Sequence, residues 1–237
     1  MQRYFTNEKK ESLFYLNLKD THHITKVMRL REGDLIEVVY QRQAYECKIV
    51  KMENQIVVEP IHVIAQEQRN FGEVTLIIPL LKEQKMDYIL QKATELGVDE
   101  IRIIETERSV VKWNAKKEDK KRERWATILK EASEQSKRLT IPILHPVVKI
   151  NDLTDLEGTK MICSTREVKN NVKLFLQNHA KYDKMFIAVG PEGGFTLQEE
   201  NAFIEKGFTP VTLGKNILRV ETVPLFCLSV LMYEYME

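Results

Sequence analysis

From residue 73 onward, runs typical of strands alternate with runs typical of helices. EVTLIIPL (73–80) is an apolar run of strand length, and the stretch 83–96 then places its apolar residues on one helical face before Gly97. The alternation continues along the chain. Further strands are expected at 100–105, 160–164, 184–189 and 209–213, and an apolar run lies at 141–148. Helices are expected at 116–137 and 170–180, with a short helix after Thr196 and an apolar helix that begins near Pro224. This order predicts an α/β fold with a largely parallel sheet covered by helices on both faces.

The part of the chain before residue 73 has a different sequence pattern. Between Asp34 and Pro60, short β-rich bursts are separated by polar residues, which is typical of a small antiparallel sheet or barrel. The polar segment 65–72 follows. We therefore expect two domains, residues 1–70 and residues 71–237.

Composition excludes several classes of protein. The 36 Lys and Arg nearly cancel the 35 Asp and Glu, so the net charge of +1 does not by itself indicate an anionic partner. The amino terminus lacks the pattern of a secretory signal, and the apolar run Leu225–Tyr233 is far shorter than the roughly 20 residues that span a bilayer. Three widely spaced cysteines without a CxxC pair fit a reducing compartment. We expect a cytoplasmic protein with no membrane association and no metal site.

Two local clusters of basic residues stand out against this balanced background. Residues 112–138 contain ten basic and five acidic residues, a net charge of +5. Their candidate phosphate contacts are Lys116, Lys117, Lys120, Lys121, Arg122 and Arg124. A second cluster, near Tyr4 and Phe5, mixes cations with aromatic rings and contains Arg3, His23, Lys26, Arg29 and Arg31. Both clusters are candidate RNA-binding surfaces, although solvated helix and sheet faces would have the same composition.

Three motifs carry candidate chemistry. Gly190-Pro191-Glu192-Gly193-Gly194 follows an expected strand, where α/β folds bind ligands, but its spacing matches neither familiar nucleotide loop and also suits a structural turn. LGKNILRVET (213–222) places Arg219 and Glu221 among apolar residues, where they need a ligand or each other as partners. In EASEQSKR (131–138), Glu131, Gln135 and Arg138 would share one helical face.

Taken together, these blocks resemble the RsmE-type 16S ribosomal RNA uridine-N3 methyltransferases of the SPOUT superfamily. The resemblance spans nearly the whole chain. Its blocks, in order, are RYF near the start, His23 to Asp34, QKATELGV (91–98), ERS (107–109), EASEQSKR (131–138), GPEGGF (190–195) and LGKNILRVET (213–222). Val223 departs from the family pattern, which often has a small residue there.

The resemblance implies a PUA-like RNA-binding β-barrel at 1–70 and a SPOUT domain at 71–237 whose carboxyl end forms a trefoil knot. It implies S-adenosylmethionine as cofactor, S-adenosylhomocysteine as product, 16S ribosomal RNA within the small subunit as partner, and a homodimer. The apolar helix 225–236 is a candidate for part of the dimer interface. The cofactor residues that it implies are Ser164, Gly190, Pro191, Glu192, Gly193, Gly194, Leu213, Gly214, Asn216, Ile217 and Leu218.

Transfer of a methyl group to uracil N3 requires loss of the N3 proton and stabilisation of negative charge on the uracil oxygens. We expect Arg219 to stabilise this charge, assisted by Arg138, and Glu131 and Gln135 to orient the base. The general base is open, with Glu192 or Glu221 suitable if its pKa were raised. A non-catalytic RNA-binding protein on the same scaffold remains an alternative. A nucleotide-dependent oxidoreductase would need a glycine fingerprint that residues 79–82 lack.

Overall fold

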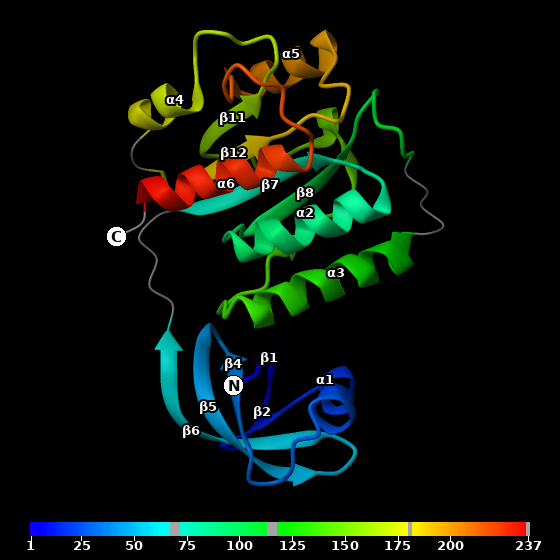
Figure 1. The fold of residues 1–237 in the computed structure, drawn as a ribbon, viewed down its shortest axis with the longest axis vertical. Helices are drawn as coiled ribbons and strands as arrows, with labels where there is room; N and C mark the ends of the chain where they lie inside the picture. The colour runs from blue at the N-terminus through cyan, green and yellow to red at the C-terminus, as the bar shows by residue number, and fades with distance from the viewer. Residues whose placement is uncertain (67–71, 113–117, 180–181, 236–237) are drawn as a thin grey trace. The chain divides into compact units, whose positions relative to one another are not determined.

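The computed structural model describes residues 1–66, 72–112, 118–179 and 182–235. The chain divides into two compact units (Figure 1). One comprises Met1–Gln68 together with Ser133–Thr140, and the other comprises Arg69–Ala132 and Ile141–Glu237. The segment 133–140 therefore packs with the first unit although it lies far along the sequence.

The first unit is built on a six-stranded sheet with the order β1-β4-β5-β6-β3-β2. Its strands are β1 (Arg3–Phe5), β2 (Glu8–Lys10), β3 (Leu13–Tyr15), β4 (Leu35–Tyr40), β5 (Gln43–Met52) and β6 (Ile56–Gln66). The short helix α1 (Leu18–His22) and the π-helical turn η1 (His23–Val27) connect β3 to β4. All pairs are antiparallel except β1 with β4.

The sheet curls around a small apolar core. Three register shifts interrupt the pairing of β5 with β6, and both long strands bend strongly (Figure 1). Phe14, Ile24, Ile36 and Ile56 are fully or almost fully buried inside the curl. The predicted β-rich amino-terminal domain is confirmed as a curled sheet whose strand path, over the described residues, does not close into a ring.

The second unit contains a parallel sheet with the order β10-β8-β7-β12-β11-β13, and β9 pairs with β8 on the same side as β10. Its strands are β7 (Glu73–Pro79), β8 (Glu100–Glu105), β9 (Ile143–Leu144), β10 (Val148–Lys149), β11 (Thr159–Cys163), β12 (Lys184–Ala188) and β13 (Thr209–Val211). Every pair is parallel. The predicted α/β fold is confirmed, while the knot stays a prediction.

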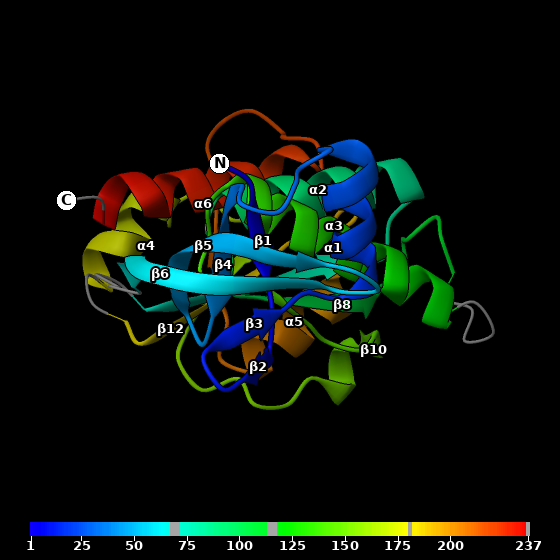
Figure 2. The ribbon, with the colours of Figure 1, turned by 90° about the horizontal axis from the view of Figure 1, so that it is seen from below.

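Helices cover both faces of this sheet (Figure 2). They are α2 (Glu83–Glu95), α3 (Glu118–Gln135), α4 (Val172–Asn178), α5 (Leu197–Glu205) and α6 (Thr222–Tyr235), with the short 3-10 turn η3 at Ile150–Asp152. Successive β7 residues point to opposite faces: Leu76 and Ile78 pack with α2 and α6, and Ile77 packs with Phe203 of α5. No helix among the described residues is long and apolar enough to cross a membrane.

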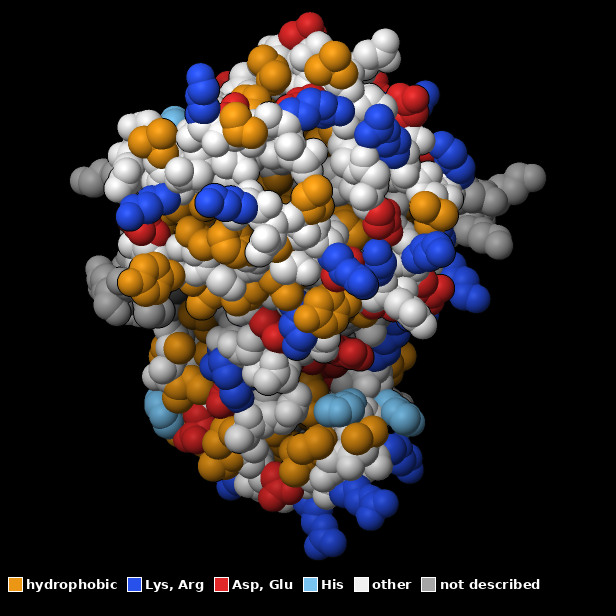
Figure 3. Space-filling model, turned by 45° about the horizontal axis from the view of Figure 1, so that its top comes forward, with side chains coloured by type: hydrophobic (Ala, Val, Ile, Leu, Met, Phe, Trp, Pro, Cys, Tyr) orange, Lys and Arg blue, Asp and Glu red, His pale blue; other side chains and the backbone are white. Residues whose placement is uncertain are grey.

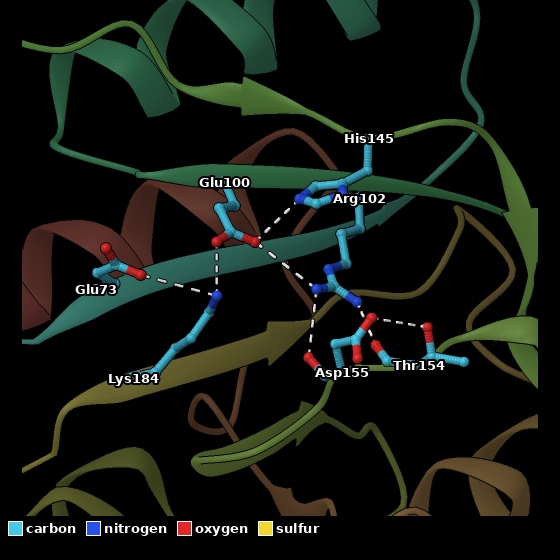
Figure 4. Close-up of polar contacts among 7 residues, drawn as sticks. All are labelled: Glu73, Glu100, Arg102, His145, Thr154, Asp155 and Lys184. Atoms are coloured by element: carbon cyan, nitrogen blue, oxygen red, sulfur yellow. Dashed lines mark hydrogen bonds and ion pairs between the residues drawn. The ribbon is translucent and has the colours of Figure 1, made fainter.

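A charged cluster lies at the amino ends of three neighbouring strands (Figure 4). Glu100, 8% exposed at the start of β8, accepts from Lys184 Nζ at 2.6 Å and pairs with His145 Nε2 at 3.0 Å. Arg102 donates to the backbone carbonyls of Thr154 and Asp155. Burial raises the pKa of the Glu100 carboxyl, but Lys184 and His145 outweigh it and hold that pKa below its usual value. The cluster therefore ties β8, β12 and the loop after η3 together.

We expect Glu100→Gln to lower the free energy of unfolding by about 2 kcal/mol at pH 7, because it removes charge-assisted hydrogen bonds from a buried site. A carboxyl whose pKa is lowered by folding stabilises the fold above its unfolded pKa, and that contribution is lost as the pH falls through the folded value. The difference between parent and variant in urea unfolding should therefore shrink below about pH 4. The exposed Glu157→Gln is the control, and an equal loss in both variants would contradict this assignment.

Candidate functional site

Three loops meet at the carboxyl edge of the parallel sheet. Strand β11 pairs with β12 on one side and with β13 on the other, so the segments that follow Cys163, Ala188 and Val211 emerge next to one another. A bridge between Asn171 and Thr212 ties two of these segments together. This is the edge at which open α/β sheets bind ligands.

Between the three loops lies a cavity of about 800 Å³. Its lining comprises Lys85, Cys163, Ser164, Thr165, Glu167, Val168, Asn171, Val189, Gly190, Pro191, Glu192, Gly194, Thr212, Leu213, Gly214, Lys215, Asn216, Ile217, Leu218, Arg219, Val220 and Val223. Val168 and Ile217 are 80% and 85% exposed, although both are large apolar side chains. A cavity of this size, with both apolar and polar side chains in its lining, fits a ligand the size of a nucleoside derivative.

Glycines make the close packing of the loops possible. A Cβ on Gly190 would lie 3.1 Å from the backbone nitrogen of Phe195, which is tighter than ordinary contact. Gly214, with φ of +126°, has a backbone conformation that other residues rarely adopt. Side chains at these positions would disturb the backbone that faces the cavity.

Two acidic residues and one lysine form an ion-pair bridge at the cavity. Lys85 Nζ, in the first turn of α2, lies 3.0 Å from Glu192 Oε1 and 3.3 Å from Glu221 Oε2. Its hydrogen bond to Glu192, together with its ion pair with Glu221, raises the pKa of Lys85. The pKa of Glu221 is lowered, first by its own backbone N–H and then by Lys85 and Arg219, against the effect of burial. Lys85 and Glu221 therefore both carry charge at neutral pH.

The loop after β11 is held by local hydrogen bonds to one carboxylate. Glu167 Oε1 accepts the backbone N–H groups of Val168, Lys169 and Asn170 at 2.9, 2.6 and 2.9 Å. These bonds, led by that from Asn170, lower the pKa of Glu167. Among the described residues, no group of three or more His, Cys, Asp or Glu side chains is arranged to hold a metal ion.

Comparison with known proteins assigns this arrangement to a family. Residues 67–232 match the RNA methyltransferase domain, and residues 16–61 match the RNA methyltransferase PUA domain. The chain belongs to this RNA methyltransferase family. The family resemblance expected from the sequence blocks is thereby confirmed.

Individual relatives align with nearly the whole chain. The ribosomal RNA small subunit methyltransferase E of Bacillus subtilis is 32% identical, with 99% of this chain and 97% of the relative covered. That of Mesomycoplasma hyopneumoniae is 33% identical over 97% and 98%. The crystal structure of a ribosomal RNA small subunit methyltransferase E from Neisseria gonorrhoeae, bound to S-adenosyl methionine, superimposes with a TM-score of 0.87 at 30% identity, covering 99% of this chain and 98% of that one.

The structure brings most of the cofactor residues expected from the family together. Ser164, Gly190, Pro191, Glu192, Gly194, Leu213, Gly214, Asn216, Ile217 and Leu218 all line the cavity. Gly193 is outside the lining, and its carbonyl accepts from Arg108 Nη1 at 2.8 Å. Of the expected catalytic residues, Arg219 lines the cavity, and Glu131 and Gln135 are exposed on α3. The prediction that Arg138 shares their helical face is wrong, because α3 ends at Gln135 and Lys137 has a φ of +61°. Arg138 is half-buried and donates to the Thr140 carbonyl.

The expected RNA contacts differ in exposure. Arg3 is only 5% exposed, and its guanidinium binds Glu37 and the carbonyls of Lys137 and Arg138. His23 is half-buried and its Nδ1 lies 3.0 Å from the Tyr4 hydroxyl. Lys26, Arg29, Arg31, Lys120 and Arg124 are exposed, and Lys121 and Arg122 are half-buried. Arg124 forms ion pairs with Glu83 and Asp87, while Lys116 and Lys117 lie outside the described residues.

Reasoning from the sequence did not predict Lys85 as a cavity residue, and it did not name Thr165, Glu167 and Asn171 individually. Lys85 follows an expected strand, so its position near a ligand-binding edge could have been predicted from the sequence. The sequence does not predict the strand order, which places β7 beside β12 and so brings Lys85 to Glu192.

Cys163 lines the cavity, and its Sγ lies 3.8 Å from that of the buried Cys227. The contact with Cys163 and burial raise the pKa of Cys227, and burial raises that of Cys47 to about 12. Because the thiolate is the reactive form, we expect iodoacetamide to modify Cys163 at least tenfold faster than either other cysteine. S-adenosylhomocysteine should slow this reaction. Peptide mapping by mass spectrometry measures all three rates, and faster labelling of Cys227 would contradict the prediction.

Proposed function

We propose that this chain transfers the methyl group of S-adenosylmethionine to N3 of a uracil in 16S ribosomal RNA, within the small ribosomal subunit. The observation that carries the proposal is the cavity between three loops of adjacent parallel strands, in a chain that belongs to an RNA methyltransferase family. The names of the full-length relatives support the small subunit as the target. The assignment of uracil N3 as the methylated atom rests on the family resemblance.

The cavity suits the cofactor. Its volume of about 800 Å³ falls within the range of small-molecule sites. Val189, Val220 and Val223 supply apolar surface for an adenine ring, and the backbone of Gly190–Gly194 and Leu213–Leu218 supplies hydrogen-bonding groups. S-adenosylmethionine supplies an electrophilic methyl group on a sulfonium. The carboxylate of Glu192 also lines the cavity, where Lys85 pairs with it at 3.0 Å.

Arg219 is the proposed catalytic cation. It is exposed in the lining of the cavity, where its positive charge would stabilise negative charge that develops on the uracil oxygens. Lys85 also lines the cavity, but its ion pairs with Glu192 and Glu221 offset its positive charge. The raised pKa that would make Glu221 a general base is not found, because its pKa is lowered. The general base stays open, because Glu192 forms an ion pair with the same lysine.

The remaining family assignments extend this proposal. Arg138 would assist Arg219, and Glu131 and Gln135 would orient the base. The first unit would bind RNA through Lys26, Arg29 and Arg31, which are exposed near the apolar Val27 and Met28. On the face drawn in Figure 3, basic, histidine and hydrophobic side chains occur together on the first unit. Such a mixture suits phosphates and unstacked bases.

A homodimer is the proposed assembly, working in the cytoplasm. Helix α6 is apolar around most of its circumference, and it leaves Met232 and Tyr233 37% and 78% exposed beside half-buried Leu225 and Phe226. A helix with apolar residues on its solvent face is stabilised when another surface covers it. A second copy of this chain, related by two-fold symmetry, would provide that surface.

The proposal is tested with labelled S-adenosylmethionine and small ribosomal subunits that lack N3-methyluridine. We expect label in N3-methyluridine at a single position, identified by nuclease digestion and mass spectrometry. Free 16S ribosomal RNA serves as the comparison substrate. RNA binding without any label, and without binding of S-adenosylmethionine, would instead support a non-catalytic RNA-binding protein.

Arg219→Ala should lower kcat by about 10²-fold to 10³-fold, the loss typical of removing one group that stabilises a developing anion. Binding of S-adenosylmethionine, measured by calorimetry, should change far less. Lys215→Ala, which removes another cation from the cavity lining, is the control. Methylation at the parental rate by Arg219→Ala would end the assignment of this role.

A further inference from the structure

Glu200 is a buried carboxylate close to the cavity that none of the steps above uses. It lies on α5 and is 6% exposed. Burying a carboxylate is costly unless hydrogen bonds or opposite charges compensate it. The groups that compensate Glu200 therefore indicate what the residue does.

Both oxygens of Glu200 bind the loop that follows β11. Oε1 accepts a hydrogen bond from Ser164 Oγ at 2.6 Å, and Oε2 forms an ion pair with Arg166 Nη1. Ser164 Oγ in turn accepts the backbone N–H groups of Arg166 at 3.1 Å and Glu167 at 3.3 Å. One carboxylate thus binds both the hydroxyl that organises the turn from Ser164 to Glu167 and the guanidinium of Arg166 within that turn.

That turn forms one wall of the cavity. Ser164, Thr165, Glu167 and Val168 all line it. Arg166 does not, but its Nη2 donates to the Phe195 carbonyl at 3.0 Å, directly after the Gly190–Gly194 loop. Glu200 and Arg166 therefore connect two of the three loops that surround the cavity.

Helix α5 has other anchors of its own. Thr196 and Glu199 form a capping box at its start, and Phe203 is fully buried in the core. The described polar contacts of Glu200 go to the cavity loop instead. Its charge-assisted bonds thus act on the loop's conformation, and a preformed loop binds a ligand more tightly because less ordering is required.

We propose that Glu200 is a positioning residue for cofactor binding, which acts through Ser164 and Arg166 to hold the β11 loop in its binding conformation. The inference rests on the proposed use of S-adenosylmethionine. It assigns Glu200 no contact with the cofactor and no part in methyl transfer. Its removal therefore weakens binding and leaves the chemical step intact.

The test measures the Kd of S-adenosylmethionine by calorimetry for the parent, Glu200→Ala, Glu200→Gln and the control Glu205→Gln, which alters an exposed residue of the same helix. We expect a Kd about tenfold higher for Glu200→Ala, corresponding to the loss of about 1.4 kcal/mol. Glu200→Gln keeps an acceptor for Ser164 and should show a smaller rise. At saturating cofactor, kcat should stay within twofold of the parent, so that the effect falls on KM.

A double-mutant cycle with Arg166→Met separates positioning from a general loss of stability. If Glu200 acts through Arg166, Glu200→Ala should weaken binding much less in the Arg166→Met background than in the parent. All measurements are made at least 15 °C below each variant's Tm, so that loss of folded protein does not contribute. If Glu200→Ala does not fold, the isosteric Glu200→Gln decides the question.

Parental Kd values in both Glu200 variants, or a fall in kcat with unchanged KM, would overturn the inference while leaving the proposed function in place. Additive effects in the cycle would overturn the route through Arg166. If the parent itself does not bind S-adenosylmethionine, the proposed function fails, and the assignment of Glu200 to cofactor binding fails with it.

Discussion

The parallel pairing of β11 with both β12 and β13 is the constraint on which the candidate site depends. Parallel strands release the chain at the same edge, so three segments separated by up to about fifty residues in sequence meet there. Antiparallel pairing of any one of them would send its loop to the opposite edge. The cavity thus follows from strand direction, before any side chain is considered. Side chains then decide what the cavity binds.

The two edges of this sheet carry charge for different purposes. At the amino edge, Glu100 is buried among Lys184, His145 and Arg102, and these contacts link strands to a loop. At the carboxyl edge, the bridge from Lys85 to Glu192 and Glu221 is partly exposed and faces a cavity. Partly exposed ion pairs contribute little to stability. Their charges remain available to a ligand, whereas those of the buried cluster do not.

The sequence predicted the second unit well, because its strands and helices are long enough for periodicity to identify them. Residues 73–80, 83–96 and 100–105 correspond closely to β7, α2 and β8. The first unit was harder to predict from the sequence. Strands β1, β2 and β3 have three residues each, too few for an alternating pattern, and the parallel pairing of β1 with β4 joins segments about thirty residues apart. The turn at Gln41 and Arg42 has positive φ at both positions without the usual Gly or Asn.

For the site, the glycine-rich loops were visible because close backbone packing demands particular residues. The partners of Ser164 and Glu192 could not be predicted, because in the sequence Glu200 and Lys85 resemble ordinary charged residues of amphipathic helices. Their roles depend on strand order, which composition and periodicity do not encode. A buried carboxylate such as Glu200 is recognised only when its partners are known.

Contacts between the sequence blocks explain why residues scattered along the chain form one arrangement. Arg108, from the ERS block, donates to the carbonyl of Gly193 in the GPEGGF block. The neighbouring Glu107 N–H binds Glu199 at 2.8 Å, and Glu199 also caps α5. In the first unit, Arg3 of the RYF block binds the carbonyls of Lys137 and Arg138 in EASEQSKR. Each of these blocks thus supports the backbone of another, so a substitution in one block is expected to act on the geometry of its partner.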